Sequence, residues 1–91
     1  MLIRIEFDTI KNERNIRERG LTFGRAAEFD FETALIEIDD RNDYGESRLT
    51  AIGMLDDIPH VLVFTMRSDV LRVISFRKAN KREVQRYEQA T

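Results

Sequence analysis

The chain has 91 residues, a net charge of −2 and no cysteine. This length predicts one domain over residues 1–91, and the weak negative charge argues against a protein that coats nucleic acid non-specifically. The absence of cysteine excludes disulfides and thiolate chemistry. With no long apolar run and no leader pattern, we expect a soluble cytoplasmic protein that does not enter a membrane.

The charges are distributed unevenly along the chain. Residues 1–65 carry 8 Lys and Arg against 14 Asp and Glu, whereas residues 66–91 carry 7 against 3. The carboxyl-terminal end is therefore basic and could hold a polyanion, while the remainder could meet a basic partner. A solvated basic surface without a ligand is the plainer alternative.

The amino-terminal region predicts a strand followed by two short helices. Residues 2–7 alternate in part between apolar and polar side chains, which is typical of an edge strand. Asp8 is a good N-cap for a helix over residues 9–19, and Gly20 suits the left-handed position that ends a helix. Thr22 is the expected cap of the second helix. The expected buried side of that helix consists of Ala26, Ala27, Phe29 and Phe31.

The first of these helices has few apolar side chains. Ile10 and Ile16 are its expected anchors, so we predict that it lies partly exposed. Lys11, Asn15 and Arg19 are spaced by four residues and share one side of the helix. This polar stripe could contact phosphates, although such a stripe is more often only solvated.

Strands are expected next, over residues 34–38, 48–55, 60–67 and 71–79. In the first of them, Ala34, Ile36 and Ile38 fall on one side. The last three are joined by short turns at residues 56–59 and 68–69, which is typical of an antiparallel meander. We therefore predict the α+β class, with a small, mostly antiparallel sheet of about four to five strands, two amino-terminal helices and one carboxyl-terminal helix.

A capping box predicts the last helix. The Asn80 side chain can accept a hydrogen bond from the first turn, and Glu83, three residues later, can reach back. Val84, Tyr87 and Thr91 follow at helical spacing, so one narrow side of the helix is expected to pack on the sheet. The basic turn before this helix could hold a phosphate, but it is also an ordinary connection between a strand and a helix.

Two features bear on metal and acid–base chemistry. His60 is the only histidine, which argues against a histidine-based metal cage or a histidine-centred acid–base pair. The segment 39–46 is acidic, and clustered carboxylates can hold Mg²⁺ for phosphodiester hydrolysis. Its carboxylates are Asp39, Asp40, Asp43 and Glu46. Their spacing aims them at no common point, so no metal site is predicted and a metal-dependent nuclease stays an alternative.

The arginines near the carboxyl end are better candidates for binding phosphate. Arginine grips phosphate through a planar fork and keeps its charge at ordinary pH. Candidates of this kind are Arg48, Arg72 and Arg77, together with Lys78. Regular alternation would place Arg72 and Arg77 on opposite sides of their strand, unless the strand bends. Glu46 is the carboxylate expected beside one of these arginines, either in a structural ion pair or as a base.

Four stretches of the chain are similar, in order and spacing, to motifs of one family. They are Glu6-Phe7-Asp8 with Lys11, Asn15 and Gly20; Phe23 with Ala26-Ala27; Gly45-Glu46-x-Arg48 with Ile52-Gly53; and Arg72-x-Ile74-Ser75-x-Arg77-Lys78-Ala79 with Glu83 and Tyr87. On these residues the chain resembles the BrnT family, the toxin halves of bacterial type II toxin–antitoxin pairs. Phe7, Arg19 and Phe76 stand where the family has Trp, His and Ala.

This resemblance implies a RelE-like fold and a toxic endoribonuclease that needs no metal or cofactor. It also implies a cognate DNA-binding antitoxin, similar to BrnA, that neutralises the toxin. The complex, rather than the toxin alone, would bind operator DNA and repress its own operon. RNA can be cleaved by its own neighbouring 2′-hydroxyl, so the protein has to supply position, proton transfer and positive charge.

On this hypothesis Arg72 and Arg77 stabilise the transition-state charge, and Glu46 or Tyr87 transfers a proton. The residues expected to hold flanking phosphates are Lys11, Arg48, Lys78 and Lys81. The alternative is a non-catalytic interaction module or an inactive toxin homologue, in which the basic end docks an acidic protein segment.

Overall fold

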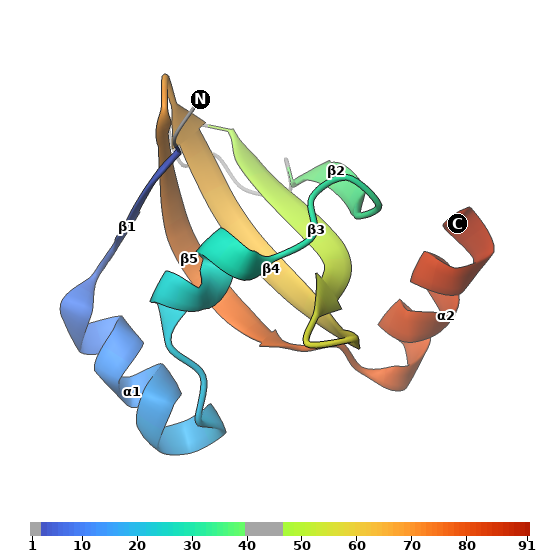
Figure 1. Ribbon diagram of the computed structural model, residues 1–91, viewed down its shortest axis with the longest axis horizontal. Helices are drawn as coiled ribbons and strands as arrows, with labels where there is room; N and C mark the ends of the chain where they lie inside the picture. Colours follow the sequence, from blue (N-terminus) through green and yellow to red (C-terminus); the bar gives the residue numbers. More distant parts are fainter. Residues whose placement is uncertain (1–2, 40–46) are drawn as a thin grey trace.

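The computed structural model describes residues 3–39 and 47–91. No helix within these residues is long and apolar enough to cross a membrane. The predicted helix boundaries at residues 9–19 and after Asn80 are confirmed, and the second helix is a 3₁₀ helix. The elements are β1 (Arg4–Phe7), α1 (Thr9–Arg19), η1 (Phe23–Glu28), β2 (Leu35–Asp39), β3 (Arg48–Leu55), β4 (Ile58–Arg67), β5 (Val70–Lys78) and α2 (Lys81–Ala90) (Figure 1).

The strands form one sheet in the order β1-β5-β4-β3-β2. The strands from β2 to β5 pair antiparallel, but β1 pairs parallel with β5. The sheet is therefore mixed, and the prediction of a mostly antiparallel sheet is wrong. Ile5 and Phe7 explain why β1 joins the sheet at β5, because they pack against the larger core from the outer edge of β5, the edge left open by the β4–β5 hairpin.

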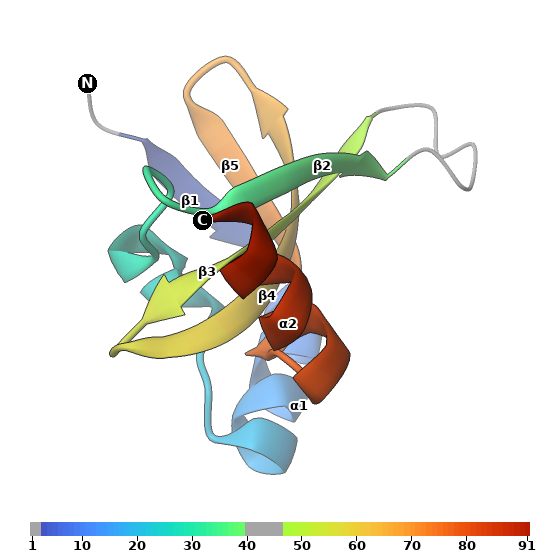
Figure 2. The same cartoon turned by 90° about the vertical axis from the view of Figure 1, so that its right-hand side faces the viewer.

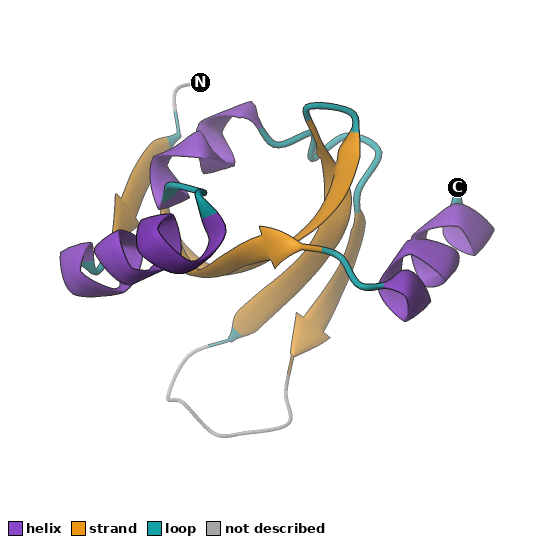
Figure 3. Cartoon of the chain, turned by 90° about the horizontal axis from the view of Figure 1, so that it is seen from below, coloured by secondary structure: helices purple, strands orange, loops and turns teal. Residues whose placement is uncertain are grey.

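The sheet has a core on each face. The larger core lies between the sheet and η1, and the smaller one lies under α2 (Figures 1 and 2). Figure 3 shows the sheet between α2 and the pair formed by α1 and η1. The larger core contains Leu21, Phe23, Ala26, Phe29, Ala51, Leu55, Leu62, Phe64, Leu71, Val73 and Phe76, and the smaller one contains Ile52, Val61 and Tyr87.

Two asparagines fasten α1 to the rest of the molecule. The Nδ2 of Asn15 donates to the carbonyl oxygens of Leu21 and Phe76, each at 2.9 Å. Asn12 accepts a hydrogen bond of 2.7 Å from the backbone N–H of Phe23. Because Phe76 lies in β5, where β1 has already ended, Asn15 takes the place of a neighbouring strand at this edge. Side-chain amides therefore position α1.

The predicted anchors of α1 are wrong. Ile10 is 77% exposed and Ile16 is 44% exposed, whereas Asn15 is 4% exposed. The helix runs past the edge of the sheet rather than across the core, so little apolar surface is available to it. Its buried contact is polar. The hydrogen bonds of the Asn15 amide compensate the free-energy cost of removing this group from water.

Some apolar residues expected on buried sides are also exposed. Ala27 points outward from η1. Ile36 and Ile38 share one side of β2, as predicted, but they are 44% and 68% exposed, and Leu35 packs against the smaller core instead. Strand β2 lies at the edge of the sheet, where η1 does not reach over its outer end.

The turn between β3 and β4 is shorter than expected. Only Asp56 and Asp57 form it, with φ angles of 53° and 60°. Positive φ at both central residues is the signature of a type I′ hairpin, which aspartate tolerates better than most residues. Strand β4 therefore begins at Ile58 rather than at His60.

Replacing the buried amide of α1 tests this account of the fold. We expect Asn15→Ala to lower the free energy of unfolding by about 2–3 kcal/mol, because two carbonyls lose a buried donor. Ile16→Ala, the matched control one residue away, should cost less than about 1 kcal/mol because the side chain is largely exposed. Urea unfolding followed by circular dichroism measures both. A larger loss for Ile16→Ala would contradict the structure.

Candidate functional site

Arg72 and Arg77 lie on the same face of the sheet because β5 contains a β-bulge. Val73 pairs with Phe64, but the next pairing joins Ser75 to Val63, so Ile74 is an extra residue. An extra residue reverses the alternation of side chains beyond it. Both arginines therefore face away from the larger core, on the side that carries α2.

A row of polar side chains crosses the sheet at the level of Arg72. Arg72 pairs with Thr65 on one side and with Glu6 on the other. Arg48 pairs with Asp39 and continues the β3–β4 register by one residue, which brings it level with Thr65. Arg48 and Arg72 thus stand two strand spacings, or about 10 Å, apart. We call the face that bears Arg48, Arg67, Arg72 and Arg77 the arginine face.

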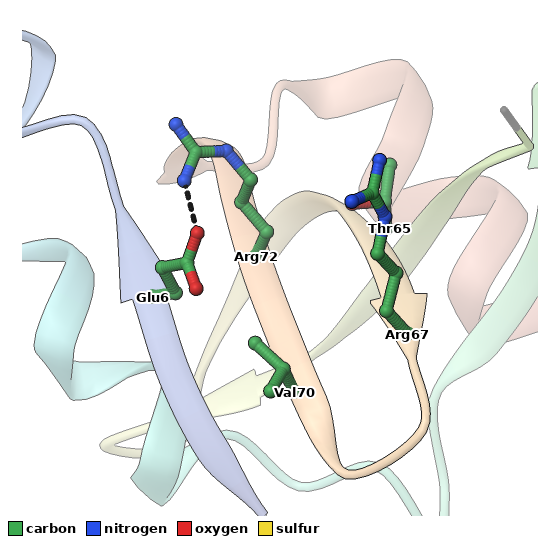
Figure 4. Close-up of a pocket in the computed structure, with 5 residues that line it drawn as sticks. All are labelled: Glu6, Thr65, Arg67, Val70 and Arg72. Carbon is green, nitrogen blue, oxygen red and sulfur yellow. Dashed lines mark hydrogen bonds and ion pairs between the residues drawn. The ribbon is translucent and has the colours of Figure 1, made fainter. Parts of the chain in front are cut away.

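The arginine face is hollowed at the end that carries Arg67 and Arg72. A cavity of about 380 Å³ is lined by Glu6, Thr65, Arg67, Val70 and Arg72. Figure 4 shows Arg67 and Arg72 on adjacent strands, with Glu6 against Arg72. The ion pair between Arg72 Nη1 and Glu6 Oε1 measures 2.5 Å, and both side chains are about half exposed. Thr65 is 3% exposed and forms part of the floor.

At the other end of the face, Arg77 is held by the first turn of α2. Its Nη1 and Nη2 donate to the two carboxylate oxygens of Glu83 at 2.8 and 2.9 Å. Glu83 also accepts from the Asn80 N–H at 2.9 Å, so the predicted capping box is confirmed. The Arg77 guanidinium lowers the pKa of Glu83 to about 2, chiefly through this hydrogen bonding. The pairing fixes Arg77 beside a cavity of about 400 Å³ between the sheet and α2.

The two arginines mark different points on the face. Their β4 partners, Thr65 and Val61, are four residues apart. At about 3.3 Å per residue, the backbones of Arg72 and Arg77 are about 13 Å apart. They are therefore placed to contact different phosphates of an extended strand.

Lysines predicted to hold phosphates lie elsewhere. Lys78 pairs with His60 and faces the opposite side of the sheet from Arg77. Lys81 is exposed at the first position of α2. Lys11 is exposed on α1, beside a smaller cavity of about 210 Å³ that also borders Ser75. The cations that were predicted to hold phosphates are thus spread over both faces of the sheet.

Tyr87 belongs to the smaller core. It is 7% exposed and packs with Ile52 and Val61. Its hydroxyl lies 3.4 Å from the hydroxyl of Thr33. These contacts attach α2 to the sheet.

Glu46, Asp40 and Asp43 lie outside the described residues. Across residues 3–39 and 47–91, no three His, Asp or Glu side chains gather closely enough to hold a metal ion. Arg67 is an arginine of this face that was not predicted from the sequence. The alternation of side chains along a strand could have placed it, because Arg67 follows Thr65 by two residues and therefore shares its side.

Comparison with known proteins places this geometry in a family. The model of the ribonuclease toxin BrnT of type II toxin–antitoxin systems matches residues 7–83. This chain belongs to the BrnT family. The crystal structure of the Brucella abortus ribonuclease toxin BrnT is 31% identical, covers 87% of this chain and 99% of its own, and superposes with a TM-score of 0.62. A search of curated proteins gave no match. The BrnT resemblance found in the four motifs is confirmed.

The ion pair beside the arginine face predicts a specific acid dependence. The usual pKa of Glu83 is 4.5 and it falls to about 2 in the fold, so its contribution to stability is complete above about pH 4.5 and is lost as the pH falls toward 2. The difference in unfolding free energy between the wild-type protein and Glu83→Gln should shrink over this range. Urea unfolding at several pH values measures it.

Glu13→Gln, which removes one negative charge from the exposed surface of α1, controls for net charge. A constant difference between wild type and Glu83→Gln down to pH 2 would show that Arg77 does not hold this carboxylate.

Proposed function

We propose that this BrnT family member is a metal-independent endoribonuclease that cleaves RNA on the arginine face. The observation that carries the proposal is the register of the sheet: the β-bulge puts Arg72 and Arg77 on one face, and the pairing of β3, β4 and β5 brings Arg72 level with Arg48. The face is open beside a helix that covers only part of it, so a single strand has room to lie across it. The placement of these arginines on one face also fits the proposed RelE-like mode of action.

The chemistry requires little beyond placed charge. The 2′-oxygen attacks the adjacent phosphorus, the bond to the 5′-oxygen breaks, and a 2′,3′-cyclic phosphate and a 5′-hydroxyl result. A proton leaves the 2′-hydroxyl and another reaches the 5′-oxygen. Arg72 has N–H groups that are not used by Glu6, and they can stabilise the charge on the phosphate oxygens. Arg77 and Arg48 would hold phosphates on either side.

Proton transfer is assigned by sequence position and by burial. Glu46 precedes Arg48 by two residues, and we propose it as the proton acceptor. Tyr87 is buried under α2 with its hydroxyl near Thr33, so we assign it to packing rather than to proton transfer. Lys11, Lys78 and Lys81 would contact more distant phosphates.

The biological setting follows from the family. We propose that the toxin acts in the bacterial cytoplasm, arrests growth and is neutralised by a DNA-binding antitoxin similar to BrnA. The complex would bind operator DNA and repress the operon. The substituted positions Phe7, Arg19 and Phe76 favour one alternative, a toxin homologue that binds partners without cutting RNA.

Removing single arginines tests the active face. We expect the purified protein to cleave a defined RNA in the presence of EDTA, and Arg72→Gln to lower kcat by about 10² to 10³, the usual cost of losing a donor to developing charge. Arg82→Gln, an exposed arginine of α2, removes the same charge away from this face and should change kcat little. Circular dichroism checks that each variant is folded.

Full activity in folded Arg72→Gln would remove Arg72 from the mechanism. Loss of cleavage with EDTA would contradict metal independence and favour a metal-dependent nuclease that uses the carboxylates of segment 39–46. No cleavage by the wild-type protein would support the non-catalytic homologue.

Expression in bacteria tests the partner. Induction of the toxin alone should stop growth, and co-expression of the product of the neighbouring gene should restore it. Arg72→Gln should permit growth while still co-purifying with that product, because binding and cleavage are separate. Growth arrest by the folded variant, or failure of the wild-type toxin to form a complex, would contradict the proposal.

A further inference from the structure

Another cavity lies at the end of β5, on the side of the sheet opposite to the arginine face. It has a volume of about 530 Å³, and its lining includes Arg19, His60, Arg77 and Lys78. Lys78 and His60 are paired across β5 and β4, so their side chains share this side. We call it the histidine hollow. Arg77 and Lys78 contact phosphates in the proposed function, but the hollow that they form with Arg19 and His60 has no role in it.

His60 is built into the wall of the histidine hollow. It is 5% exposed, and its ring lies 5.7 Å from that of Phe76. Its Nδ1 is 2.7 Å from the carbonyl oxygen of Ile58. A carbonyl can only accept, so Nδ1 carries the hydrogen and Nε2 is the nitrogen left for a ligand in the hollow. A protonated ring would donate from Nε2 to an anionic oxygen.

The other polar groups of the hollow favour an anion. Arg19 is oriented by its Nη1, which donates to the Oδ1 of buried Asn15 at 2.6 Å. The Lys78 side chain is exposed beside it. Asp56 is the acidic residue of the lining, but Arg25 donates to both of its carboxylate oxygens at 2.7 and 2.8 Å and compensates its charge. Arg19, Lys78 and the imidazole of His60 therefore line one cavity, and among the described residues of its lining no carboxylate is left without a cation beside it.

Arg77 connects the hollow to the arginine face. Its side chain borders both the histidine hollow and the cavity between the sheet and α2. A strand leaving the arginine face at this end would pass Arg77 and come next to Lys78.

We propose that the histidine hollow binds a phosphate group through Arg19, His60 and Lys78, and that this phosphate belongs to the RNA strand that passes Arg77. The source of the phosphate rests on the proposed function, whereas the capacity to bind phosphate does not. The hollow would then extend the grip on RNA by one phosphate beyond the cleavage site.

Proton NMR of the histidine ring tests this directly, because His60 is the only histidine and gives a unique pair of signals. Inorganic phosphate and a short 2′-O-methyl RNA, which has no free 2′-hydroxyl to attack, are titrated separately. Sodium chloride at equal ionic strength is the reference. We expect a saturable shift of the His60 signals with both probes, and about tenfold weaker binding in Lys78→Ala.

Arg17→Ala is the matched control, since it removes a cation from the same end of α1 but does not line the hollow. If Arg17→Ala weakened phosphate binding as much as Lys78→Ala does, the loss would reflect net charge alone, and the proposed site would be overturned. A shift with phosphate alone would keep the phosphate site and overturn its place on the RNA path. No saturable shift with either probe would overturn both. Cleavage plays no part in these readings, so they stand apart from the test of Arg72.

Discussion

Strand β5 places apolar side chains in the larger core on one face of the sheet and arginines on the other face. The extra residue at Ile74 makes this arrangement possible. Before the bulge, Leu71 and Val73 point into the larger core; beyond it, Phe76 does the same. Without the extra residue, a strand that buries Val73 would turn Phe76 toward the other face. The same constraint sends Arg72 and Arg77 to the arginine face, so the main core and the proposed active face share one cause.

Polar side chains, rather than apolar ones, position the parts around this strand. Asn15 closes the edge of β5 at Phe76, where no neighbouring strand is present, and thereby sets α1 against the sheet. At the end of β5, the pair of Arg77 and Glu83 fixes the start of α2. Arg77 therefore serves in both structure and proposed function, which is why Arg72 is the cleaner variant for testing catalysis.

The sequence predicted what local rules determine. Asp8 and Gly20 mark the ends of α1, and the capping box at Asn80 marks the start of α2. The parallel pairing of β1, the bulge at Ile74 and the burial of Asn15 depend on contacts between distant segments, which no local pattern encodes. For the site, the sequence shows that the carboxyl-terminal end is basic. It does not show that the cations of this end are divided between two faces of the sheet, because that division depends on the register of β5 against β4.

The central claim is that RNA lies on the arginine face, and backbone amide NMR with a 2′-O-methyl RNA tests it most directly. We expect the largest shift changes on the amides of Thr65, Arg72 and Arg77, with the amide of Ala27 on η1, which lies on the opposite face of the sheet, little affected. Changes confined to η1, with none at Thr65 or Arg72, would contradict this claim and place the RNA on the opposite face of the sheet.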